Sequence, residues 1–302
     1  MYGPSDEAES IATIHAALDA GINLLDTGDF YGMGHNEMLI GRALQGRRDR
    51  ALLSVKFGAL RAPNGAFLGV DGRPPAVRNF LAYSLRRLGT DHVDIYRLSR
   101  FDPAVPIEDT VGAIADMVKD GHVRYIGLSE VGAGTVRRAQ AAHPICDLQI
   151  EYSLISRSIE RAILPATREL GIAITAYGVL SRGLLTASPV GAAGDFRAHL
   201  PRFAGANGDQ NRLMVEALAA FAAERGATPA QVAIAWVASR GSDIIPVIGA
   251  RTRAQLADAL GALELRLSPD DLARLEEICN PSRVAGTRYD PAQMRMLDSE
   301  KE

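Results

Sequence analysis

The fold is decided by residues 21–32, which read GINLLDTGDFYG. The part from Ile22 to Asp26 is short and apolar, as in a strand buried within a parallel sheet. A helix is expected before it, because apolar residues between Ile11 and Leu18 recur at helical spacing and Gly21 supplies a stop. The next helix is expected to begin at Asn36. A helix–strand–helix unit of this kind predicts a parallel α/β sheet.

Buried-strand patterns recur along the chain, and helical patterns separate them. Beyond the first run, they lie at residues 52–57, 93–98, 123–128, 147–151, 172–177 and 244–248. Strands separated by helices imply right-handed βαβ units. Repeated this often, they predict an α/β fold with a parallel (β/α)8 TIM-type barrel as the leading architecture and a doubly wound open sheet as the alternative. No low-complexity linker divides the chain, so residues 1–302 are expected to form a single domain.

Two helix starts carry recognisable caps. Thr228 followed by Pro229 opens the second of two helices expected between residues 211 and 240, and Ser268 followed by Pro269 opens the last helix. Serine and threonine are favoured N-cap residues, and proline suits the first helical position.

Two long stretches, 58–74 and 181–210, are expected to be irregular. Both follow predicted strands, which in a barrel places them on the C-terminal face, where loops build active sites. The tail from Pro281 is a third candidate for covering that face.

The composition is that of an ordinary water-soluble chain of 302 residues, 23% of them charged, with a net charge of −3. This balance argues against a nucleic-acid-binding surface, which normally carries a basic excess. No apolar run approaches the roughly 18 residues of a membrane span, so we expect no membrane segment and a cytoplasmic protein.

The two cysteines, Cys146 and Cys279, are interpreted as buried thiols, and no metal site is expected. The oligomeric state is not readable from the sequence.

Three side chains with complementary chemistry are predicted to meet at strand ends. Asp26 closes one buried run and Lys56 closes the next. Neighbouring parallel strands lie about 4.8 Å apart, so the two side chains can touch. Tyr31 follows Asp26 closely enough for its ring to fold over the barrel mouth.

The chemistry of this trio follows from charge. A phenol has a pKa of about 10 and is a poor acid at neutral pH, but a nearby ammonium lowers that pKa. A carboxylate beside the lysine offsets the cost of burying it. The trio is therefore a coherent proton donor for a carbonyl oxygen that receives a hydride. Taken singly, Asp26 could be a turn or cap residue, Tyr31 a loop aromatic and Lys56 a lysine that extends to solvent.

The run at 21–32, followed by Asn36-Glu37, resembles the signature of the aldo-keto reductase family. Further segments that resemble the family follow in order: Ser54-Val55-Lys56, Val93-Asp94-Ile95-Tyr96, Ile126-Gly127-Leu128-Ser129, Gln149-Ile150-Glu151-Tyr152, Thr175-Ala176-Tyr177 and Ile248-Gly249-Ala250-Arg251. Several ordered motifs over nearly the whole chain make this a strong signal. The resemblance implies an eight-stranded β/α barrel that binds NADP(H) without a glycine-rich dinucleotide fold.

By this resemblance, Tyr31 matches the family's general acid, and Lys56 and Asp26 match the partners that tune its pKa. Ser129 and Gln149 match the groups that hydrogen-bond the nicotinamide carboxamide. The alternative for these two residues is hydrogen bonding to backbone at the ends of their strands.

Tyr177 matches the aromatic residue that stacks on the nicotinamide ring. The loop that holds the adenosine phosphate is matched by Gly249, Ala250 and Arg251. Arg251 would favour NADPH over NADH, because a 2′-phosphate prefers a cation, although a solvated charge at a helix start is the alternative. Gln255 and Asp258 match positions that contact the adenine end.

The sequence departs from the family pattern at several positions. Ser99 stands where the family usually has histidine, and its hydroxyl either holds a water in place of the ring or leaves room. Glu130 and Ala259 stand at positions where asparagine is common. The family also has a strand before the first helix, and Met1 falls in the loop that would follow it, so the first strand is expected to be missing. An incorrect start site or a shortened sequence is the expected explanation, because a seven-stranded barrel would have two unpaired edges.

Three functions are compatible with these features. The leading hypothesis is NADP(H)-dependent reduction of small-molecule aldehydes or ketones to alcohols, with Tyr31 as general acid and Ser99 as a weaker polar contact. The alternative is a low-activity NADPH-binding sensor or regulatory subunit, because the potassium-channel β subunits resemble the family and lack the same histidine. A third is an unrelated barrel enzyme, such as an isomerase of phosphorylated sugars. Residues that could line a substrate pocket are Arg182, Arg197, His199, Arg202, Phe203, Arg288 and Tyr289.

Overall fold

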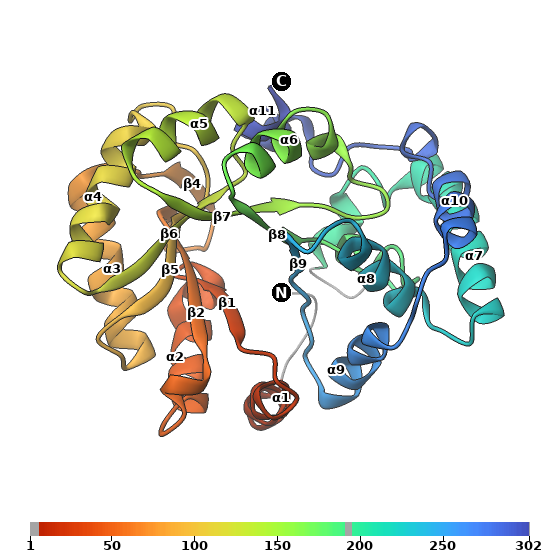
Figure 1. Ribbon diagram of the computed structural model, residues 1–302, viewed down its shortest axis with the longest axis horizontal. Helices are drawn as coiled ribbons and strands as arrows, with labels where there is room; N and C mark the ends of the chain where they lie inside the picture. Colours follow the sequence, from red (N-terminus) through yellow and green to blue (C-terminus); the bar gives the residue numbers. More distant parts are fainter. Residues whose placement is uncertain (1–5, 191–194, 302) are drawn as a thin grey trace. The chain divides into compact units, whose positions relative to one another are not determined.

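Helices and parallel strands alternate along the chain in the computed structural model, which describes residues 6–190 and 195–301 (Figure 1). The chain divides into two units. The first comprises the described residues up to Gln149, Ala162–Ala173 and the residues from Leu297. The second comprises Ile150–Arg161 and Ile174–Met296. The expectation of a single domain stays a prediction, and Met1, on which the missing-strand expectation rests, lies outside the described residues.

The first unit is built on a parallel sheet with strand order β1-β2-β5-β6-β7. Its strands are β1 (Leu24–Gly28), β2 (Leu52–Phe57), β5 (Val93–Leu98), β6 (Val123–Ser129) and β7 (Ile145–Glu151), whose last two residues belong to the second unit. Its helices are α1 (Glu7–Asp19), α2 (His35–Ala43), α3 (Pro74–Leu88), α4 (Ile107–Lys119), α5 (Ala133–Ala142) and α6 (Ile163–Glu169). Figure 1 shows α2, α3 and α4 along one side of these strands.

Strand β1 begins two residues later than its apolar run predicts. Gly21 adopts a left-handed conformation with φ +87°, and the Ile22 N–H turns back to donate to the Ala17 carbonyl at 3.0 Å. Ile22 therefore closes helix α1 instead of starting the strand. The strand also continues to Gly28, so Asp26 lies inside β1 and not at its end.

The stretch 58–74, expected to be irregular, contains an antiparallel hairpin. Strand β3 (Ala59–Arg61) pairs with β4 (Phe67–Val70). The Asn64 side chain accepts the Ala66 N–H at 3.0 Å, and Gly65 supplies a left-handed residue with φ +83°. These local turn contacts hold the hairpin together, although the strand signal of the flanking residues is weak.

The second unit contains a parallel pair of strands, β8 (Ala173–Tyr177), whose first residue belongs to the first unit, and β9 (Ile244–Pro246). Its helices are α7 (Gly205–Glu224), α8 (Pro229–Ser239), α9 (Arg253–Leu260), α10 (Pro269–Ile278) and α11 (Pro291–Arg295). Helix α7 begins at Gly205, so part of the stretch expected to be irregular is helical. The count of about seven strands is confirmed, because seven strands of the described residues pair in parallel.

Both predicted helix caps are confirmed. Thr228 accepts the Gln231 N–H, and the Gln231 side chain returns to the Thr228 N–H, which forms a capping box at α8. Ser268 and Asp271 form the same reciprocal arrangement at α10. No helix among the described residues is long and apolar enough to cross a membrane.

A buried ion pair crosses the interior of the first unit. The side chains of Arg97 and Asp147 are 0% and 5% exposed, and their charged atoms lie 3.0 Å apart. Gly127 lies against this pair, since a Cβ added there would approach Asp147 Oδ1 to 2.5 Å and Arg97 Nε to 2.9 Å. A residue without a side chain is therefore required at this point of β6.

We predict that Gly127→Ala lowers the free energy of unfolding by at least about 2 kcal/mol, because the methyl group displaces a buried ion pair. Gly112→Ala is the matched control. Gly112 lies on helix α4, where an added Cβ would meet no atom of the described residues within 4 Å, so alanine there should stabilise by about 0.5–1 kcal/mol. Chemical denaturation of both variants measures the difference, and equal effects would contradict the argument.

Candidate active site

The predicted contact between Asp26 and Lys56 is present. Lys56 Nζ forms a close ion pair with Asp26 Oδ2, and the two side chains are 5% and 11% exposed. The other carboxylate oxygen, Oδ1, accepts hydrogen bonds from Ser54 Oγ at 2.9 Å and from Gln149 Nε2 at 2.7 Å. Both oxygens of this nearly buried carboxylate are therefore satisfied.

The electrostatic balance keeps Asp26 ionised. Burial raises the pKa of Asp26, but the charges of Lys56 and Arg97 and the hydrogen bonds from Lys56 and Gln149 outweigh it, so the pKa stays below its usual value.

Arg97 is a member of this charge cluster that the sequence reasoning missed. It lies opposite Lys56 in the register of β2 and β5, is fully buried, and donates from Nη2 to Ser54 Oγ at 3.0 Å. An arginine within an otherwise apolar strand was the available signal. Its partner Asp147 is 50 positions away, so the sequence alone did not pair the two residues.

Tyr31 lies beside the ion pair. It begins a short 3-10 helix, Tyr31–Gly34, and its ring is half-buried. Lys56 Nζ lies 5.1 Å from the centre of the ring, and the edge of Phe30 packs against it with 4.8 Å between ring centres. The structure thus brings together all three members of the predicted trio.

The loop that carries Tyr31 is fastened to β2 by Asp29. Its N–H donates to the Lys56 carbonyl at 2.9 Å, and its Oδ2 accepts the Gly58 N–H at 3.2 Å. These two bonds lie on either side of Phe57. Asp29 therefore ties the segment before Tyr31 to the end of the strand that bears Lys56.

A second buried carboxylate lies close to Asp29. Glu37 is 0% exposed, and its Oε2 accepts a hydrogen bond from Arg87 Nη1 at 3.0 Å. Asp29 Oδ1 and Glu37 Oε1 are buried without a hydrogen-bond partner among the described residues. Burial, with a further contribution from the charge of Glu37, raises the pKa of Asp29 to about 7, although the Gly58 N–H and Arg87 oppose the shift.

Ser99 and Ser129 present buried hydroxyls to the same unit. Ser99 follows β5, where its N–H donates to the Phe57 carbonyl at 2.8 Å, and Ser129 ends β6 opposite Gln149 in β7. Both side chains are 2% exposed, and neither hydroxyl has a hydrogen-bond partner among the described residues. An unsatisfied buried hydroxyl is costly, so both are suited to receive a ligand or a water.

Glu130 is held by the C-terminal residues. It has a left-handed backbone with φ +54°, and its Oε2 accepts a hydrogen bond from Ser299 Oγ at 2.7 Å. Asp298 accepts the N–H of Gly132, the N-cap residue of helix α5, at 2.9 Å. The carboxylate of Glu130, at a position where the family commonly has asparagine, therefore has a hydrogen-bond partner within the first unit.

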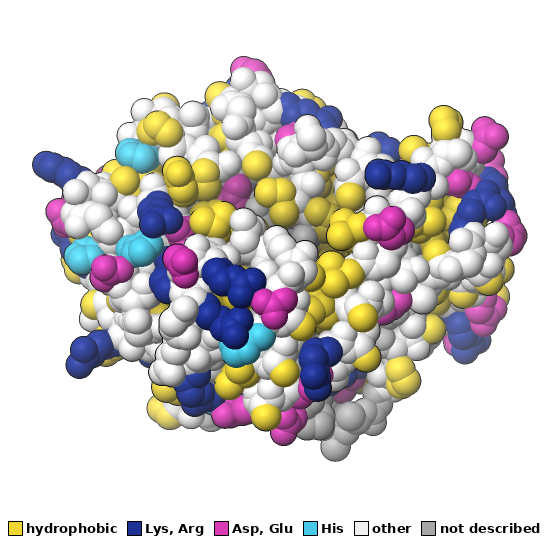
Figure 2. Space-filling view, turned by 60° about the horizontal axis from the view of Figure 1, so that its bottom comes forward, with side chains coloured by type: hydrophobic (Ala, Val, Ile, Leu, Met, Phe, Trp, Pro, Cys, Tyr) yellow, Lys and Arg dark blue, Asp and Glu magenta, His cyan; other side chains and the backbone are white. Residues whose placement is uncertain are grey.

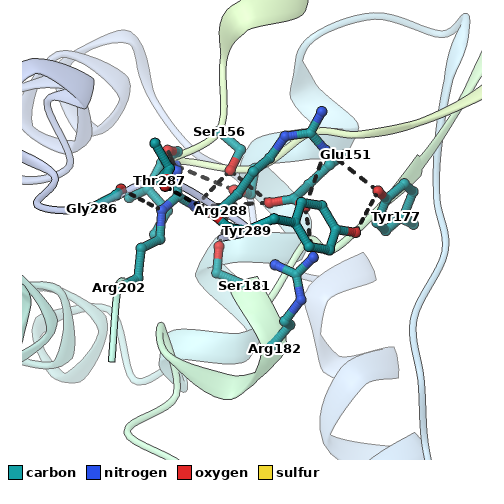
Figure 3. A network of polar contacts seen from close by, with 12 residues as sticks. Glu151, Ser156, Tyr177, Ser181, Arg182, Arg202, Gly286, Thr287, Arg288 and Tyr289 are labelled. Carbon is teal, nitrogen blue, oxygen red and sulfur yellow. Dashed lines mark hydrogen bonds and ion pairs between the residues drawn. The ribbon is translucent and has the colours of Figure 1, made fainter. Parts of the chain in front are cut away.

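The remaining predicted residues belong to the second unit. Tyr177 ends β8, is half-buried, and has its hydroxyl oxygen 3.1 Å from that of Tyr289 (Figure 3). Arg288 Nη1 lies 3.4 Å from the same Tyr177 oxygen. The surroundings of Tyr177 are formed by the tail from Pro281, which was a candidate from the sequence for covering the C-terminal face. Arg182 and Arg202 also contribute to them.

The loop from Gly249 to Arg251 precedes helix α9, which Thr252 caps. Arg251 is exposed, and its N–H donates to Gln255 Oε1 at 2.8 Å. Asp258 Oδ1 accepts hydrogen bonds from Thr228 Oγ1 at 2.9 Å and from Gln231 Nε2 at 3.1 Å, so this carboxylate already serves the start of α8.

Residues 1–280 match a model of the Aldo/keto reductase family. The chain belongs to this family. Membership makes the chain an oxidoreductase of (β/α)8 barrel class that acts on small-molecule carbonyl compounds, and aldo-keto reductases use NADP(H). No group of His, Cys, Asp and Glu within the described part of the chain is arranged to hold a metal ion.

Three relatives illustrate the match. A probable aldo-keto reductase 1 of Glycine max is 40% identical over 291 residues, which cover 95% of this chain and 84% of that protein. Aldo-keto reductase yakc [NADP(+)] of Schizosaccharomyces pombe is 38% identical over 300 residues, covering 96% and 88%. The structure of glycerol dehydrogenase AKR11B4 from Gluconobacter oxydans aligns with a TM-score of 0.85 and 29% identity over 96% of this chain and 90% of that chain.

Asp29 makes the stability of this aldo-keto reductase depend on pH. Its pKa is 3.8 when unperturbed and about 7 in the folded protein, so between these values the folded state retains a proton that the unfolded state has lost. The contribution of Asp29 to stability therefore falls as the pH rises from 3.8 to about 7.

We predict that Asp29→Asn stabilises the protein by about 1–3 kcal/mol at pH 8 and leaves stability nearly unchanged at pH 4. An amide at this position has no ionisation cost and can donate towards Glu37. Denaturation curves at both pH values measure the effect. Asp120→Asn, at an exposed aspartate, is the control and should leave the pH dependence unchanged. A similar gain at both pH values would contradict the assigned pKa.

Proposed function

We propose that this chain reduces aldehyde or ketone groups to alcohols with NADP(H), and that Tyr31 is the general acid. The observation that supports this most directly is the buried Asp26–Lys56 ion pair with its ammonium 5.1 Å from the Tyr31 ring centre. A cation held at this place favours the phenolate that remains after Tyr31 gives up its proton.

The proposed reaction balances with two transfers to one carbonyl group. NADPH, when bound, supplies the hydride that adds to the carbonyl carbon. Tyr31 donates its hydroxyl proton to the carbonyl oxygen, so that an alcohol and a phenolate result. Lys56 stabilises the phenolate, Asp26 holds Lys56, and solvent returns the proton to Tyr31.

Ser99 has a smaller role in this proposal. Its hydroxyl is buried and has no partner among the described residues, so it can hydrogen-bond the substrate oxygen or hold a water there. A serine does not titrate near neutral pH and supplies no second acid. Binding and orientation of the carbonyl, not proton transfer, are therefore assigned to Ser99.

The residues proposed for the cofactor have features that fit it. Ser129 offers a buried hydroxyl that has no hydrogen-bond partner among the described residues, and it is suited to the nicotinamide carboxamide. Gln149 lies beside it in register. A Cβ added to Gly249 would meet no atom of the described residues within 4 Å, which leaves space for a phosphate.

Tyr177 is proposed to stack on the nicotinamide ring. Ala250 and Arg251 are proposed to hold the adenosine phosphate, and Gln255 and Asp258 to face the adenine end. Asp258 would do so only by sharing an oxygen that already accepts two hydrogen bonds.

A sensor or regulatory role with low turnover is the second candidate. The observation in its favour is Ser99, because the site lacks the titratable ring usual at this position. The two candidates share NADPH binding and differ in turnover.

Other expectations stay predictions. Lys and Arg side chains lie among Asp and Glu side chains on the face shown in Figure 2. The expectation of no nucleic-acid partner and that of a cytoplasmic location are untested.

We predict that Tyr31→Phe lowers kcat by at least about 100-fold, the usual contribution of a general acid, while the Kd for NADPH changes little. Steady-state turnover over a panel of aldehydes and ketones, with a parallel NADPH titration, tests this. Tyr83→Phe, at an exposed tyrosine of α3, is the matched control. Retained turnover in Tyr31→Phe would overturn the assignment, and NADPH binding without turnover in the wild type would favour the sensor.

We predict that Arg251→Met raises the Kd for NADPH about 10- to 100-fold, as expected for a lost charge-assisted phosphate contact, and leaves the Kd for NADH unchanged. Fluorescence titration with the two cofactors measures this. Arg253→Met, two residues further on at the start of α9, is the control. An equal loss for both cofactors would show that Arg251 does not read the 2′-phosphate.

A further inference from the structure

A short C-terminal segment, Ala285–Tyr289, is fastened to the second unit by side chains far away in sequence. We call it the C-terminal strap. Asn211 in α7 accepts the Ala285 N–H and donates to the Ala285 carbonyl, both at 2.9 Å. Arg202 donates to the Gly286 carbonyl at 3.3 Å. Gly286 has φ +82°, and a Cβ there would lie 2.8 Å from the Pro201 carbonyl, so the strap approaches the backbone closely.

The strap is also tied to the buried carboxylate of Glu151. Arg288 Nη1 lies 3.4 Å from Glu151 Oε2, and Arg182 Nη2 lies 3.1 Å from the same oxygen. The other oxygen, Oε1, accepts a hydrogen bond from Ser156 Oγ at 2.8 Å. Glu151 is 2% exposed, so these charge-assisted contacts are little screened by water. They hold Arg288 in one place.

Tyr289 lies between the two guanidinium groups that Glu151 holds. The Arg182 group is 4.4 Å from the ring centre, and that of Arg288 is 5.5 Å from it. This geometry allows cation–π attraction from both. Figure 3 shows that the hydroxyl of Tyr289 points to the hydroxyl of Tyr177, with the two oxygens 3.1 Å apart. The ring of Tyr289 is thus fixed and its hydroxyl is aimed at Tyr177.

The Tyr177 side chain is consequently anchored at its far end. The backbone carbonyl of Tyr177 accepts the Tyr152 N–H at 3.1 Å, which holds the main chain in place. The Tyr177 hydroxyl contacts Tyr289 and Arg288. Stacking on a planar ligand requires a ring in one orientation. A ring that is already held in place loses less conformational freedom when the ligand binds.

We propose that Tyr289 is a positioning residue for the cofactor, which holds the Tyr177 ring ready to stack on the nicotinamide. This rests on the proposed function, because the stacking role of Tyr177 is itself part of that proposal. The C-terminal strap then contributes to nicotinamide affinity without touching the cofactor. By reciprocity, a bound nicotinamide stabilises the docked strap.

The decisive variant is Tyr289→Phe, which removes only the hydroxyl and keeps the ring between the two arginines. Two probes are titrated: NADPH, and adenosine 2′,5′-bisphosphate, which has the 2′-phosphate and adenine but no nicotinamide. We expect the Kd for NADPH to rise about 3- to 10-fold, as for one lost neutral hydrogen bond. The Kd for the bisphosphate should stay that of the wild type. Tyr83→Phe is again the matched control, with both values unchanged.

The other outcomes overturn the inference in distinguishable ways. Unchanged NADPH affinity in Tyr289→Phe would show that the hydroxyl contact does not matter. An equal loss for both probes would show a general structural role, not positioning of the nicotinamide partner. Failure of the wild type to bind NADPH would overturn the proposed function itself, and the inference with it.

A measurement on the wild type covers the case in which the variant does not fold. Amide hydrogen exchange of Ala285–Tyr289 is compared without ligand, with adenosine 2′,5′-bisphosphate and with NADPH. We expect slower exchange with NADPH than with the bisphosphate. Equal exchange with the two ligands would refute the coupling between the strap and the nicotinamide.

Discussion

The ion pair between Lys56 and Asp26 is the constraint on which the proposed site depends. Burying an ammonium and a carboxylate is costly unless each is paired and the remaining oxygens are satisfied. Ser54 and Gln149 complete the shell of Asp26, and Arg97 adds a second cation close by. These residues come from β1, β2, β5 and β7, so the pair requires four strands to be correctly registered. The same requirement orients Lys56 toward the ring of Tyr31.

The loop that carries Tyr31 shows how the site is held without rigid secondary structure. Asp29 bonds to the backbone on both sides of Phe57, and Glu37 lies buried behind it with Arg87 as its partner. Burial raises the pKa of Asp29 to about 7, although the hydrogen bond from the Gly58 N–H opposes the shift. Such perturbed carboxyl groups are common beside active sites. Here the perturbed group holds the loop and does not touch the reacting atoms.

Residues near the C-terminus contribute to each unit separately. In the first, Ser299 holds the carboxylate of Glu130, which stands where the family often has asparagine. In the second, the C-terminal strap holds Tyr177 through Tyr289. The tail was expected to contribute to a substrate-facing surface. Its observed contacts are with Glu130 in the first unit and with Tyr177 in the second.

The sequence by itself determined the alternation of strands and helices, the helix caps and the placement of Asp26, Tyr31 and Lys56 near neighbouring strand ends, because these depend on local periodicity and short spacings. The pattern along the chain did not predict the start of β1 or the hairpin at 59–70, because hydrogen bonds in turns set both of them. Only the tertiary structure decided which buried polar groups meet. Tyr177 and Tyr289 are 112 positions apart, and no pattern along the chain pairs them. Such contacts depend on strand order and side-chain rotamers, which long-range packing alone selects.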